Sequence, residues 1–569
     1  MNTEIANIFT EMADLLEIEG ANPFRVRAYR RAARTVSGYT HSMAELVREE
    51  EDLTELSGIG EDLAGKIKEI VETGSLTKLK EVKSRTPADL TRMLNVAGLG
   101  PKRVKALYDE LKISTLTELE QAAAEGRIHE LHGFGEKIEQ QILKDLQRED
   151  RQDERVRIDV AEEIIQPLVR YLKSLEGAER VEVAGSYRRR KETVGDLDLL
   201  ITSDRGKEII DRFVNYEDVV NVLSQGETRS TVEFRSGMQV DLRVVSEESY
   251  GAALFYFTGS KEHNIAIRNL ALDQGLKVNE YGVFREEERV AGESEAGIYA
   301  LLGLAYVEPE LREDRGEVRA AQQGTLPALV TLEEIRGDLQ CHTQASDGEA
   351  TLREMAEAAQ ARGYDYLAIT DHSAYIGIVQ GLDEAGVAAQ IDEMDRLNDA
   401  LEGFRLLKAI EVDIMENGDL DLPDEILARL DLRVCAIHSK FNLSREEQTE
   451  RIIRAMDNPY FNILAHPTGR RIGKRAPYAL DMKQVLDAAR ERGCFLEINA
   501  QPERLDLDDV AARMAKERGV KLAISTDAHR PDALELMRYG VDQARRAWLE
   551  AEDVLNTYRW EALKELLRR

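Results

Sequence analysis

Histidines and carboxylates recur at the ends of short apolar runs in the last third of the chain, as in YLAITDH (366–372). The residues at or near these ends are His342, Asp347, Asp371, His372, Glu411, His438, His466, Asp527 and His529. The landmarks 342, 372, 411, 438, 466, 497 and 527 are 27 to 39 residues apart, the length of one strand plus one helix. Mixed imidazole and carboxylate ligands suit Zn, Mn or Fe better than Ca or Mg. The pattern therefore predicts one metal cluster assembled from many strands.

A second group of carboxylates lies in the middle of the chain. In AGSYRRRKETVGDLDLLIT (184–202), Asp196 and Asp198 are two residues apart on a predicted strand and point to one face. Because neighbouring carboxylates repel each other without a cation, they predict bound Mg²⁺ or Mn²⁺. Asp241, in QVDLRVV, lies on a later strand that can pair beside the first. Three such carboxylates can hold two metals for displacement at phosphorus. The alternative is a solvated pair of aspartates on an edge strand.

Phosphate ligands are predicted just upstream of these carboxylates. Gly185 and Ser186 form a turn that a phosphate can approach, and Arg189 offers two parallel donors to the same group.

A Gly-apolar-Gly pattern followed by an amphipathic segment occurs three times before residue 150. The copies are LSGIGEDLAGKIKEI (56–70), VAGLGPKRVKALYDEL (96–111) and LHGFGEKIEQQIL (131–143). Their glycines are Gly58, Gly60, Gly98, Gly100, Gly133 and Gly135. Free N–H groups at a helix start favour an anion. The copies resemble helix-hairpin-helix motifs, which bind DNA phosphates without reading sequence; ordinary helix packing is the alternative.

Composition limits the class of protein. The 569 residues suggest several domains, and the net charge of −31 argues against a general nucleic-acid binder. Local basic segments do occur, at 25–34 with five arginines and at 188–191. No apolar run approaches the roughly 20 residues that span a bilayer, and the N-terminus lacks a secretory pattern. We expect a cytoplasmic protein without a membrane partner, with three reduced cysteines.

The middle segment resembles the palm of family X DNA polymerases, through GSYRRR, GDLDLL, VDLRVV and YFTGS. The resemblance implies that Gly185, Ser186 and Arg189 bind a nucleoside triphosphate. It also implies nucleotide contacts by Tyr256, Phe257, Thr258, Gly259 and Asn264, with the two aromatic residues on the deoxyribose and Asn264 on the base. Arg268 would contact the template strand. The segment LEIEGANPFRVRAYRRAARTV resembles the small DNA-end-binding domain of the same family.

Lys66 takes the position of the Schiff-base lysine in family members with deoxyribose-phosphate lyase activity. Asp62 stands where a cation would help to bind the 5′-phosphate, so the pattern supports this activity only weakly. A solvated helix lysine is the alternative.

Residues 331–569 resemble the PHP (polymerase and histidinol phosphatase) domain. The resemblance implies a barrel of seven strands and helices with ligands at the strand C-termini. It implies two or three Mn²⁺, Zn²⁺ or Fe²⁺ ions for phosphodiester hydrolysis. The implied metal ligands are His342, Asp347, His372, Glu411, His438, His466, Asp527 and His529. The family motif opens His-x-His, but Gln340 replaces the first histidine, and its neutral amide is a weaker donor.

These patterns predict a multidomain fold of mixed α+β and α/β class. The expected parts are a DNA-end-binding domain (1–83), a helical domain with two further helix-hairpin-helix motifs (84–150), the nucleotidyltransferase palm (151–245), a thumb-like nucleotide-selection domain (246–315), a linker (316–332) and the PHP domain (333–569).

The function expected from these parts is a DNA polymerase that fills short gaps during DNA repair. The PHP domain would add a Mn²⁺-dependent 3′–5′ exonuclease, with 3′-end cleaning or cleavage at abasic sites as further activities. The expected partners are gapped or nicked DNA and dNTPs, with the chain a monomer. One alternative is a phosphatase of a small phosphate ester tethered to DNA. Another is a polymerase whose PHP domain is only structural.

Overall fold

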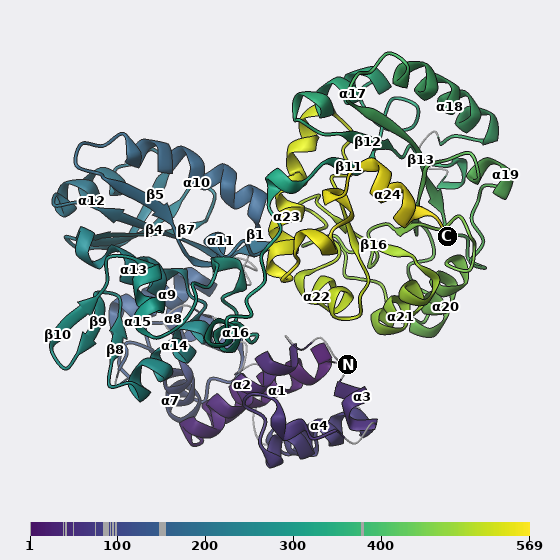
Figure 1. The fold of residues 1–569 in the computed structure, drawn as a ribbon. Coiled ribbons are helices and arrows are strands. Elements are labelled where there is room, and N and C mark those ends of the chain that lie inside the picture. Colours follow the sequence, from purple (N-terminus) through teal and green to yellow (C-terminus); the bar gives the residue numbers. More distant parts are fainter. Residues whose placement is uncertain are drawn as a thin grey trace. The chain divides into compact units, whose positions relative to one another are not determined.

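The computed structural model describes residues 2–37, 39, 43–48, 51–73, 75–83, 90, 93, 96, 99–131, 133–146, 155–376 and 381–569. The chain forms two compact units, Met1–Glu154 and Arg155–Arg569, and each is described by itself (Figure 1). Among the described residues, no helix has both the length and the apolar character needed to cross a bilayer.

The first unit is helical. Its helices are α1 (Asn2–Ile18), α2 (Pro23–Ser37), α3 (Met43–Arg48), α4 (Glu61–Thr73), α5 (Thr77–Lys83), α7 (Pro101–Leu111), α8 (Leu116–Ala124) and α9 (Glu136–Leu146). One core draws on residues 5–82 and includes Phe9 and Tyr29, whose rings meet edge to face. A second core gathers Ile18 with residues 90–142, including Leu107. Apolar positions at helical spacing thus fold onto two separate centres.

The second unit begins with a five-stranded sheet in the order β2-β4-β7-β6-β5. The elements of this region are β1 (Val156–Arg157), α10 (Ile158–Lys173), β2 (Arg180–Val183), α11 (Gly185–Arg188), β3 (Thr193–Val194), β4 (Asp196–Thr202), α12 (Gly206–Val214), β5 (Val219–Gln225), β6 (Arg229–Phe234) and β7 (Gln239–Val245). Strands β1 and β3 pair with each other in a separate two-stranded sheet. Strands β4 and β7 are parallel, and their register places Asp198 beside Asp241. Apolar residues of α10 and α12, such as Ile165 and Phe213, complete the core with the sheet. The pairing of β4 with β7 is therefore what brings the separated aspartates together.

A smaller domain follows the sheet. Its elements are α13 (Tyr250–Thr258), α14 (Lys261–Asp273), β8 (Lys277–Asn279), β9 (Gly282–Arg285), β10 (Glu288–Ala291), α15 (Glu295–Leu301) and α16 (Glu317–Gln323). The last helix lies in the segment 316–332, for which the sequence predicts a linker. Its Glu317 is fully buried and lies 2.7 Å from Nδ1 of His263. The polar composition of the segment suggests exposure, but a partner 54 residues away makes this glutamate part of the domain interior.

Residues from 337 onward form a seven-stranded parallel sheet in the order β11 to β17. The elements are β11 (Gly337–Cys341), α17 (Leu352–Ala361), β12 (Tyr366–Ile369), α18 (Glu384–Asn398), β13 (Arg405–Asp413), α19 (Asp424–Leu427), β14 (Leu432–Ala436), α20 (Arg445–Ala455), β15 (Ile463–Leu464), α21 (Met482–Arg492), β16 (Phe495–Asn499), α22 (Asp509–Glu517), β17 (Leu522–Ser525), α23 (Met537–Arg546) and α24 (Trp560–Leu567). A parallel bridge between Cys341 and Ala528 joins the two ends of the sheet. The strands thus curl into a barrel with helices outside (Figure 1), as the spacing of 27 to 39 residues predicts.

Inner and outer faces of this barrel have separate apolar cores. Tyr366, Ala368 and Leu407 belong to the inner core, which Leu563 and Leu567 of α24 join. Alternate residues of the same strands join the outer core with the helices. Because strand residues alternate in direction, the inner series of β12, β13 and β14 continues to three predicted metal ligands, His372, Glu411 and His438.

The first strand departs from regular register between Asp338 and Cys341. Leu339 packs in the inner core, whereas Cys341 packs in the outer core. An irregularity of this kind re-aims the residues that follow it. Gln340 and His342, the neighbours of Cys341, are therefore directed to the inner face.

Helix starts follow local sequence signals. Thr351 and Glu354 form a capping box at the start of α17, and Ser444 and Glu447 form one at α20. Each Ser or Thr hydroxyl accepts the N–H three residues later, and each Glu returns the bond. These helices begin where Ser/Thr-x-x-Glu occurs, which fixes the loops that carry the cluster.

A buried chain of opposite charges joins the barrel to the polymerase-like domains within the second unit. Arg546 of α23 pairs with Glu313 at 3.1 Å and with Asp509 of α22 at 2.6 Å. The same guanidinium donates to the carbonyl of Arg189 at 2.7 Å, and Glu313 also pairs with Arg189 at 3.2 Å. The neighbouring carboxylates raise the pKa of Arg546 despite its complete burial. Arg546 therefore stays charged at any physiological pH.

We expect Arg546→Met to lower the free energy of unfolding of the barrel by about 3–5 kcal/mol, because it leaves two buried carboxylates without their cation. Urea unfolding followed by tryptophan fluorescence measures this. Both tryptophans of the chain, Trp548 and Trp560, lie in the C-terminal part, so the signal reports that part and, through Trp548, its contact with the apolar core of the smaller domain.

Arg568→Met is the matched control, since Arg568 is 62% exposed and pairs only with Glu565. It should stay within about 0.5 kcal/mol of the parent. A change equally small in Arg546→Met would contradict the structural role of the buried pair.

Candidate active sites

The three aspartates of the middle segment converge near the starts of β4 and β7, two neighbouring inner strands of the five-stranded sheet. Asp198 and Asp241 are direct partners on β4 and β7, and Asp196 lies two residues before Asp198 on the same face. Asp241 is held by Thr231, whose hydroxyl lies 2.5 Å from Oδ1, and by Gln239 at 2.9 Å from Oδ2. These two hydrogen bonds hold the carboxylate of Asp241 in one orientation, as expected for a metal ligand.

Crowding of these carboxylates shifts their titration. Burial, then Asp196 and Asp241, raise the pKa of Asp198 to about 7. Desolvation in the cleft and the charge of Asp241 also raise the pKa of Asp196. When neighbouring carboxylates raise each other's pKa in this way, a bound divalent cation relieves their mutual repulsion. The donors present, all carboxylate oxygens, fit Mg²⁺ or Mn²⁺.

A cleft of about 600 Å³ opens beside the aspartates. Its lining includes most of the residues predicted to bind nucleotide and template, namely Gly185, Ser186, Arg189, Tyr256, Phe257, Gly259, Asn264 and Arg268. Thr258 lies behind the lining, where its hydroxyl accepts a bond from Arg188 at 2.6 Å. His263, next to Asn264 in the chain, is fully buried and does not line the cleft; it lies between Glu317 and Tyr299.

Two features prepare the cleft for a phosphate. The backbone of Gly185 has φ +62°, and a Cβ there would come within 2.6 Å of Oδ2 of Asp198, so only glycine fits. The hydroxyl of the next residue, Ser186, is buried and has no hydrogen-bond partner among the described residues. An unused donor next to the guanidinium of Arg189 suits an anionic oxygen.

The glycine pairs of the first unit lead into helices as expected. Gly58 and Gly60 precede α4, Gly100 caps α7, and Gly133 and Gly135 precede α9. Gly98 lies outside the described residues. Lys66 on α4 forms an ion pair with Asp62 one turn earlier and lies 5.6 Å from the ring centre of Tyr29. The carboxylate of Asp62 is thus paired with the lysine that the sequence predicts as a nucleophile.

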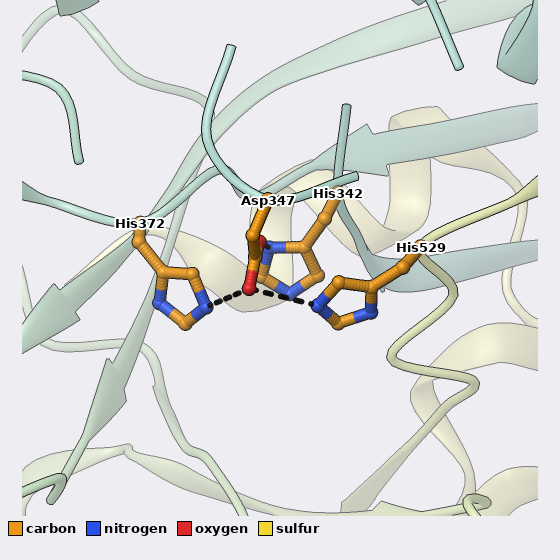
Figure 2. A group of neighbouring side chains, drawn as sticks. All are labelled: His342, Asp347, His372 and His529. Carbon is orange, nitrogen blue, oxygen red and sulfur yellow. Dashed lines mark ion pairs between the residues drawn. The ribbon is translucent and has the colours of Figure 1, made fainter. Parts of the chain in front are cut away.

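All eight predicted ligands of the C-terminal cluster meet at the C-terminal ends of the barrel strands. Figure 2 shows the carboxylate of Asp347 between the imidazoles of His372 and His529, at 3.5 and 3.3 Å. His342 stacks on His529 with ring centres 4.3 Å apart. These four residues, and the set of His372, Glu411 and His438, each bring ligand atoms within 4.8 Å of one another. Two adjoining metal positions fit this arrangement.

Glu411 is the centre of the cluster. Its carboxylate is buried and lies 3.2 Å from His372, 3.3 Å from His438 and 3.1 Å from His466. Burial opposes the charge of Glu411, yet His372 and His438 hold the pKa of this carboxyl well below its ordinary value. Burial lowers the pKa of His438, but Glu411 and Asp413 outweigh it and raise that pKa to about 10. Shifted pKa values in a cluster of titratable side chains are typical of functional sites.

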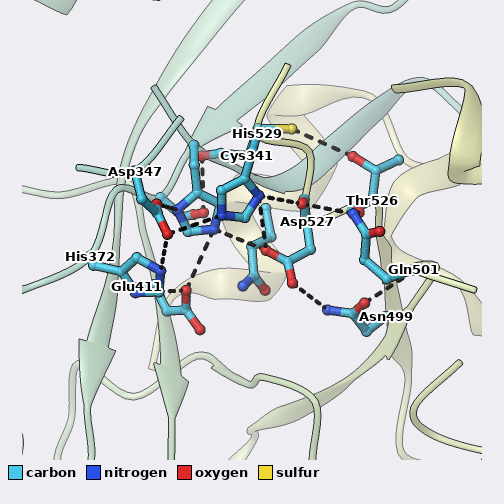
Figure 3. A network of polar contacts seen from close by, with 12 residues as sticks. Cys341, Asp347, His372, Glu411, Asn499, Gln501, Thr526, Asp527 and His529 are labelled. Atoms are coloured by element: carbon cyan, nitrogen blue, oxygen red, sulfur yellow. Dashed lines mark hydrogen bonds and ion pairs between the residues drawn. The ribbon is translucent and has the colours of Figure 1, made fainter. Parts of the chain in front are cut away.

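Other ligands are oriented by a network behind them (Figure 3). Asp527 lies 3.0 Å from His342 and accepts a bond from Asn499 at 3.2 Å. Gln501 donates to the carbonyls of Thr526 and Asp527. The backbone φ of Asp527 is +51°, and that of His466 is +27°. Such strained backbone at two ligands is typical of functional sites.

Two acidic residues support ligands rather than complete the cluster. Asp371, which the strand-end spacing includes, accepts bonds from Thr343 and Ser346 and so holds the loop before Asp347. Asp413, two residues after Glu411, lies 3.0 Å from Nδ1 of His438 and fixes that ring. Asp413 was missed from the sequence, although its position in EVD at a strand end was the available signal.

Gln340 is buried on the inner face near the cluster. Neither atom of its side-chain amide has a hydrogen-bond partner in the described part of the chain. An unused amide oxygen at this position fits a weak neutral ligand, while the eight stronger donors are all in place.

Three arginines at this site had no sequence signal. Arg471, Arg475 and Arg504 line a cavity of about 520 Å³ together with His438, His466 and Asp527. They lie on loops between strands and helices, where composition does not reveal which side chains face inward.

Family models match most of the chain. They are a helix-hairpin-helix domain (1–76), a SAM-like helix-hairpin-helix tandem (74–148), the DNA polymerase beta palm (155–234), the DNA polymerase beta thumb (253–313) and the PHP domain (338–501).

One similar protein matches the whole chain, and others match only about a third of it. "DNA polymerase/3'-5' exonuclease PolX" of Bacillus subtilis (strain 168) is 37% identical over 570 residues, covering 100% of this chain and 99% of that protein. A "probable phosphatase" of Thermoanaerobacter sp. (strain X514) is 34% identical over 232 residues, covering 38% of this chain and 90% of that protein. A "probable phosphatase" of Acetivibrio thermocellus is 33% identical over 201 residues, covering 34% and 78%. Only the first spans both sites, and with the palm, thumb and PHP matches it shows that the chain belongs to the PolX family, the family X DNA polymerases that carry a C-terminal PHP domain.

Proposed function

We propose that the chain is a DNA-directed DNA polymerase that fills short gaps, with a metal-dependent 3′–5′ exonuclease in its barrel. The observation that carries the polymerase half is the convergence of Asp196, Asp198 and Asp241 beside the phosphate-ready turn at Ser186. The full-length relative named for both activities supports joining them in one chain.

In the polymerase site, Mg²⁺ or Mn²⁺ held by the three aspartates would activate the attacking hydroxyl and steady the leaving pyrophosphate. Ser186 and Arg189 bind the triphosphate, with the unused hydroxyl of Ser186 as a donor. Tyr256 and Phe257 face the same cleft and contact the sugar. Asn264 is oriented by its bond to the carbonyl of Tyr256 at 2.7 Å, which leaves its buried amide oxygen free for the base edge.

In the barrel site, two or three ions, with Mn²⁺ the best activator, would polarise a phosphodiester and supply the nucleophile for hydrolysis. The eight ligands fit ions of this class, since they combine imidazole nitrogens with carboxylate oxygens. Asp413 and Asn499 hold the ligands His438 and Asp527 in place. Trimming of 3′ ends is the activity we assign here, with blocked 3′ termini and abasic sites as further substrates.

We expect proton release when the polymerase aspartates bind a divalent cation. The pKa of Asp198 is raised to about 7 in the metal-free fold, above its ordinary value of 3.8. Below pH 7 the folded carboxyl therefore holds a proton that the unfolded chain loses above pH 4, so metal-free stability falls as the pH rises between these values. Mn²⁺ must displace that proton at pH 6 but not at pH 8.5.

Calorimetric titration in buffers of different ionisation enthalpy measures the released protons. Asp198→Asn removes this share of the release and leaves the share of the barrel histidines. Equal proton release by the parent chain and Asp198→Asn at pH 6 would contradict the raised pKa.

We expect Asp198→Ala to abolish nucleotide addition, at least about a thousandfold, because the proposed metal site would lose one of its three carboxylates. Primer extension on gapped DNA with dNTPs measures this, and 3′ trimming by the same variant should persist. Asp204→Ala, at an exposed aspartate just after β4, is the control. Extension at the parent rate by Asp198→Ala would refute the assignment of the polymerase site.

We expect His438→Ala to remove 3′ trimming and to leave nucleotide addition intact. Chelation should also stop trimming, Mn²⁺ should restore it, and Mg²⁺ alone should not. A gapped duplex labelled at the 3′ end, incubated with and without dNTPs, shows shortening and extension together. Unchanged trimming by His438→Ala, or near-zero transition metal bound to the parent chain, would mean that the barrel is only structural.

A further inference from the structure

A short hairpin, residues 469–475, lies between β15 and α21 at the mouth of the barrel site. The backbone N–H groups of Arg471 and Arg475 each donate to the carbonyl of the other at 2.8 Å, which closes the hairpin. Both side chains line the cavity that holds the metal ligands. Both also line an adjoining cavity of about 390 Å³, with Arg470 and Lys474. The same two arginines of the hairpin thus line both the cavity of the predicted metal ligands and the adjoining cavity.

Positive charge at this place is only partly neutralised by the described carboxylates: Glu503 pairs with Arg471 at 3.5 Å and with Lys474 at 3.3 Å, and Asp527 lies 3.7 Å from Arg504. Burial, then Arg504 and Arg471, lower the pKa of Arg475, as expected where cations crowd. Arg475 makes no ion pair with a carboxylate in the described residues; it donates to the carbonyl of Gly469 at 2.8 Å and lies over the ring of Phe441. Nε of Arg471 is buried and finds no hydrogen-bond partner in the part of the chain that the structure describes, while its Nη2 lies 3.5 Å from Glu503. In a chain of net charge −31, such crowding of guanidinium groups suits an anionic ligand.

Contacts from two sides hold the hairpin. Arg470 pairs with Glu192 of the palm at 2.6 Å and donates to the carbonyl of Arg504 at 2.8 Å. Ile472 packs against the apolar core of the palm, and its N–H donates to the carbonyl of Glu503 at 2.7 Å. The polymerase half of the molecule therefore fixes a loop that lines the hydrolytic site.

We propose that Arg471 and Arg475 form a phosphate-binding subsite for the phosphodiester groups of DNA next to the scissile one, and that the palm holds this subsite in place. The inference rests on the proposed exonuclease function and names the feature that selects its substrate. The predicted metal ligands would engage the scissile group, whereas the arginines also line the adjoining cavity. A DNA strand reaches both, but a small ester with one phosphate reaches only the first.

The test compares two substrates with the full-length chain in Mn²⁺. One is a short single-stranded DNA labelled at its 3′ end, and the other is bis(p-nitrophenyl) phosphate, which has one phosphodiester. We expect Arg475→Met and Arg471→Met each to lower kcat/KM for DNA relative to kcat/KM for the small ester by about tenfold, through KM. The slope of log KM for DNA against log salt concentration should fall by about 0.7 for each phosphate group that an arginine no longer neutralises.

Three further variants make the outcome specific. Arg475→Lys keeps the charge and should recover part of the loss, although it lacks the forked geometry of the guanidinium. Glu192→Gln, on the palm, should shift the substrate ratio in the same direction. Arg490→Met, at an exposed position of α21, removes an equal charge outside the cavity and should leave the ratio unchanged.

Each result decides between the two proposals. A parent chain that trims no DNA contradicts the exonuclease function itself. A parent chain that trims DNA, with Arg475→Met and Arg471→Met keeping its substrate ratio, overturns the subsite. Equal loss on both substrates also overturns it, because the arginines would then support the metal ligands rather than the DNA strand.

Discussion

Repulsion between carboxylates gathered at strand ends is the constraint on which both sites depend. In the five-stranded sheet, the parallel pairing of β4 with β7 brings Asp198 beside Asp241, and the crowding raises the pKa of Asp198 to about 7. In the barrel, imidazoles surround the buried Glu411 and hold it ionised. Side-chain donors therefore balance charge within the barrel cluster, whereas the sheet leaves a negative site that a divalent cation must complete. The two sites also differ in donor type, because the sheet offers carboxylate oxygens whereas the barrel combines them with imidazole nitrogens.

The two catalytic halves share structural supports in the second unit. Arg546 of the barrel bonds to the backbone of Arg189 and to Glu313, the carboxylate that Arg189 also contacts. In the opposite direction, Glu192 of the palm holds Arg470 on the hairpin beside the barrel cluster. Each half thus supplies a fixed point for a loop of the other. Breaking buried ion pairs of this kind is costly, so these contacts hold each of the two loops in one position.

Much of the chemistry was predictable because it depends on local pattern. Strand-end histidines and carboxylates, the Asp-x-Asp pair and the Gly-Ser turn are visible in short segments, and the structure brings them together as expected. The helix starts at Thr351 and Ser444 follow from four-residue signals. Residues that act through distant partners were not predictable. Glu317 lies in a segment predicted to be a polar linker, because the local pattern does not reveal that its carboxylate bonds to His263.

The sequence by itself determined which chemistries the chain can perform, since ligand types and their spacing follow from single strands and turns. Tertiary structure alone decided which side chains face a site. The irregular register in β11 directs Gln340 and His342 inward, and loop closure places Arg471, Arg475 and Arg504 together. Contacts between segments far apart in the chain set these directions, and a local pattern carries no record of them. The physical reason is that strand ends recur along the sequence at the length of one strand plus one helix. The direction of a loop side chain depends instead on the distant segments that pack against the loop.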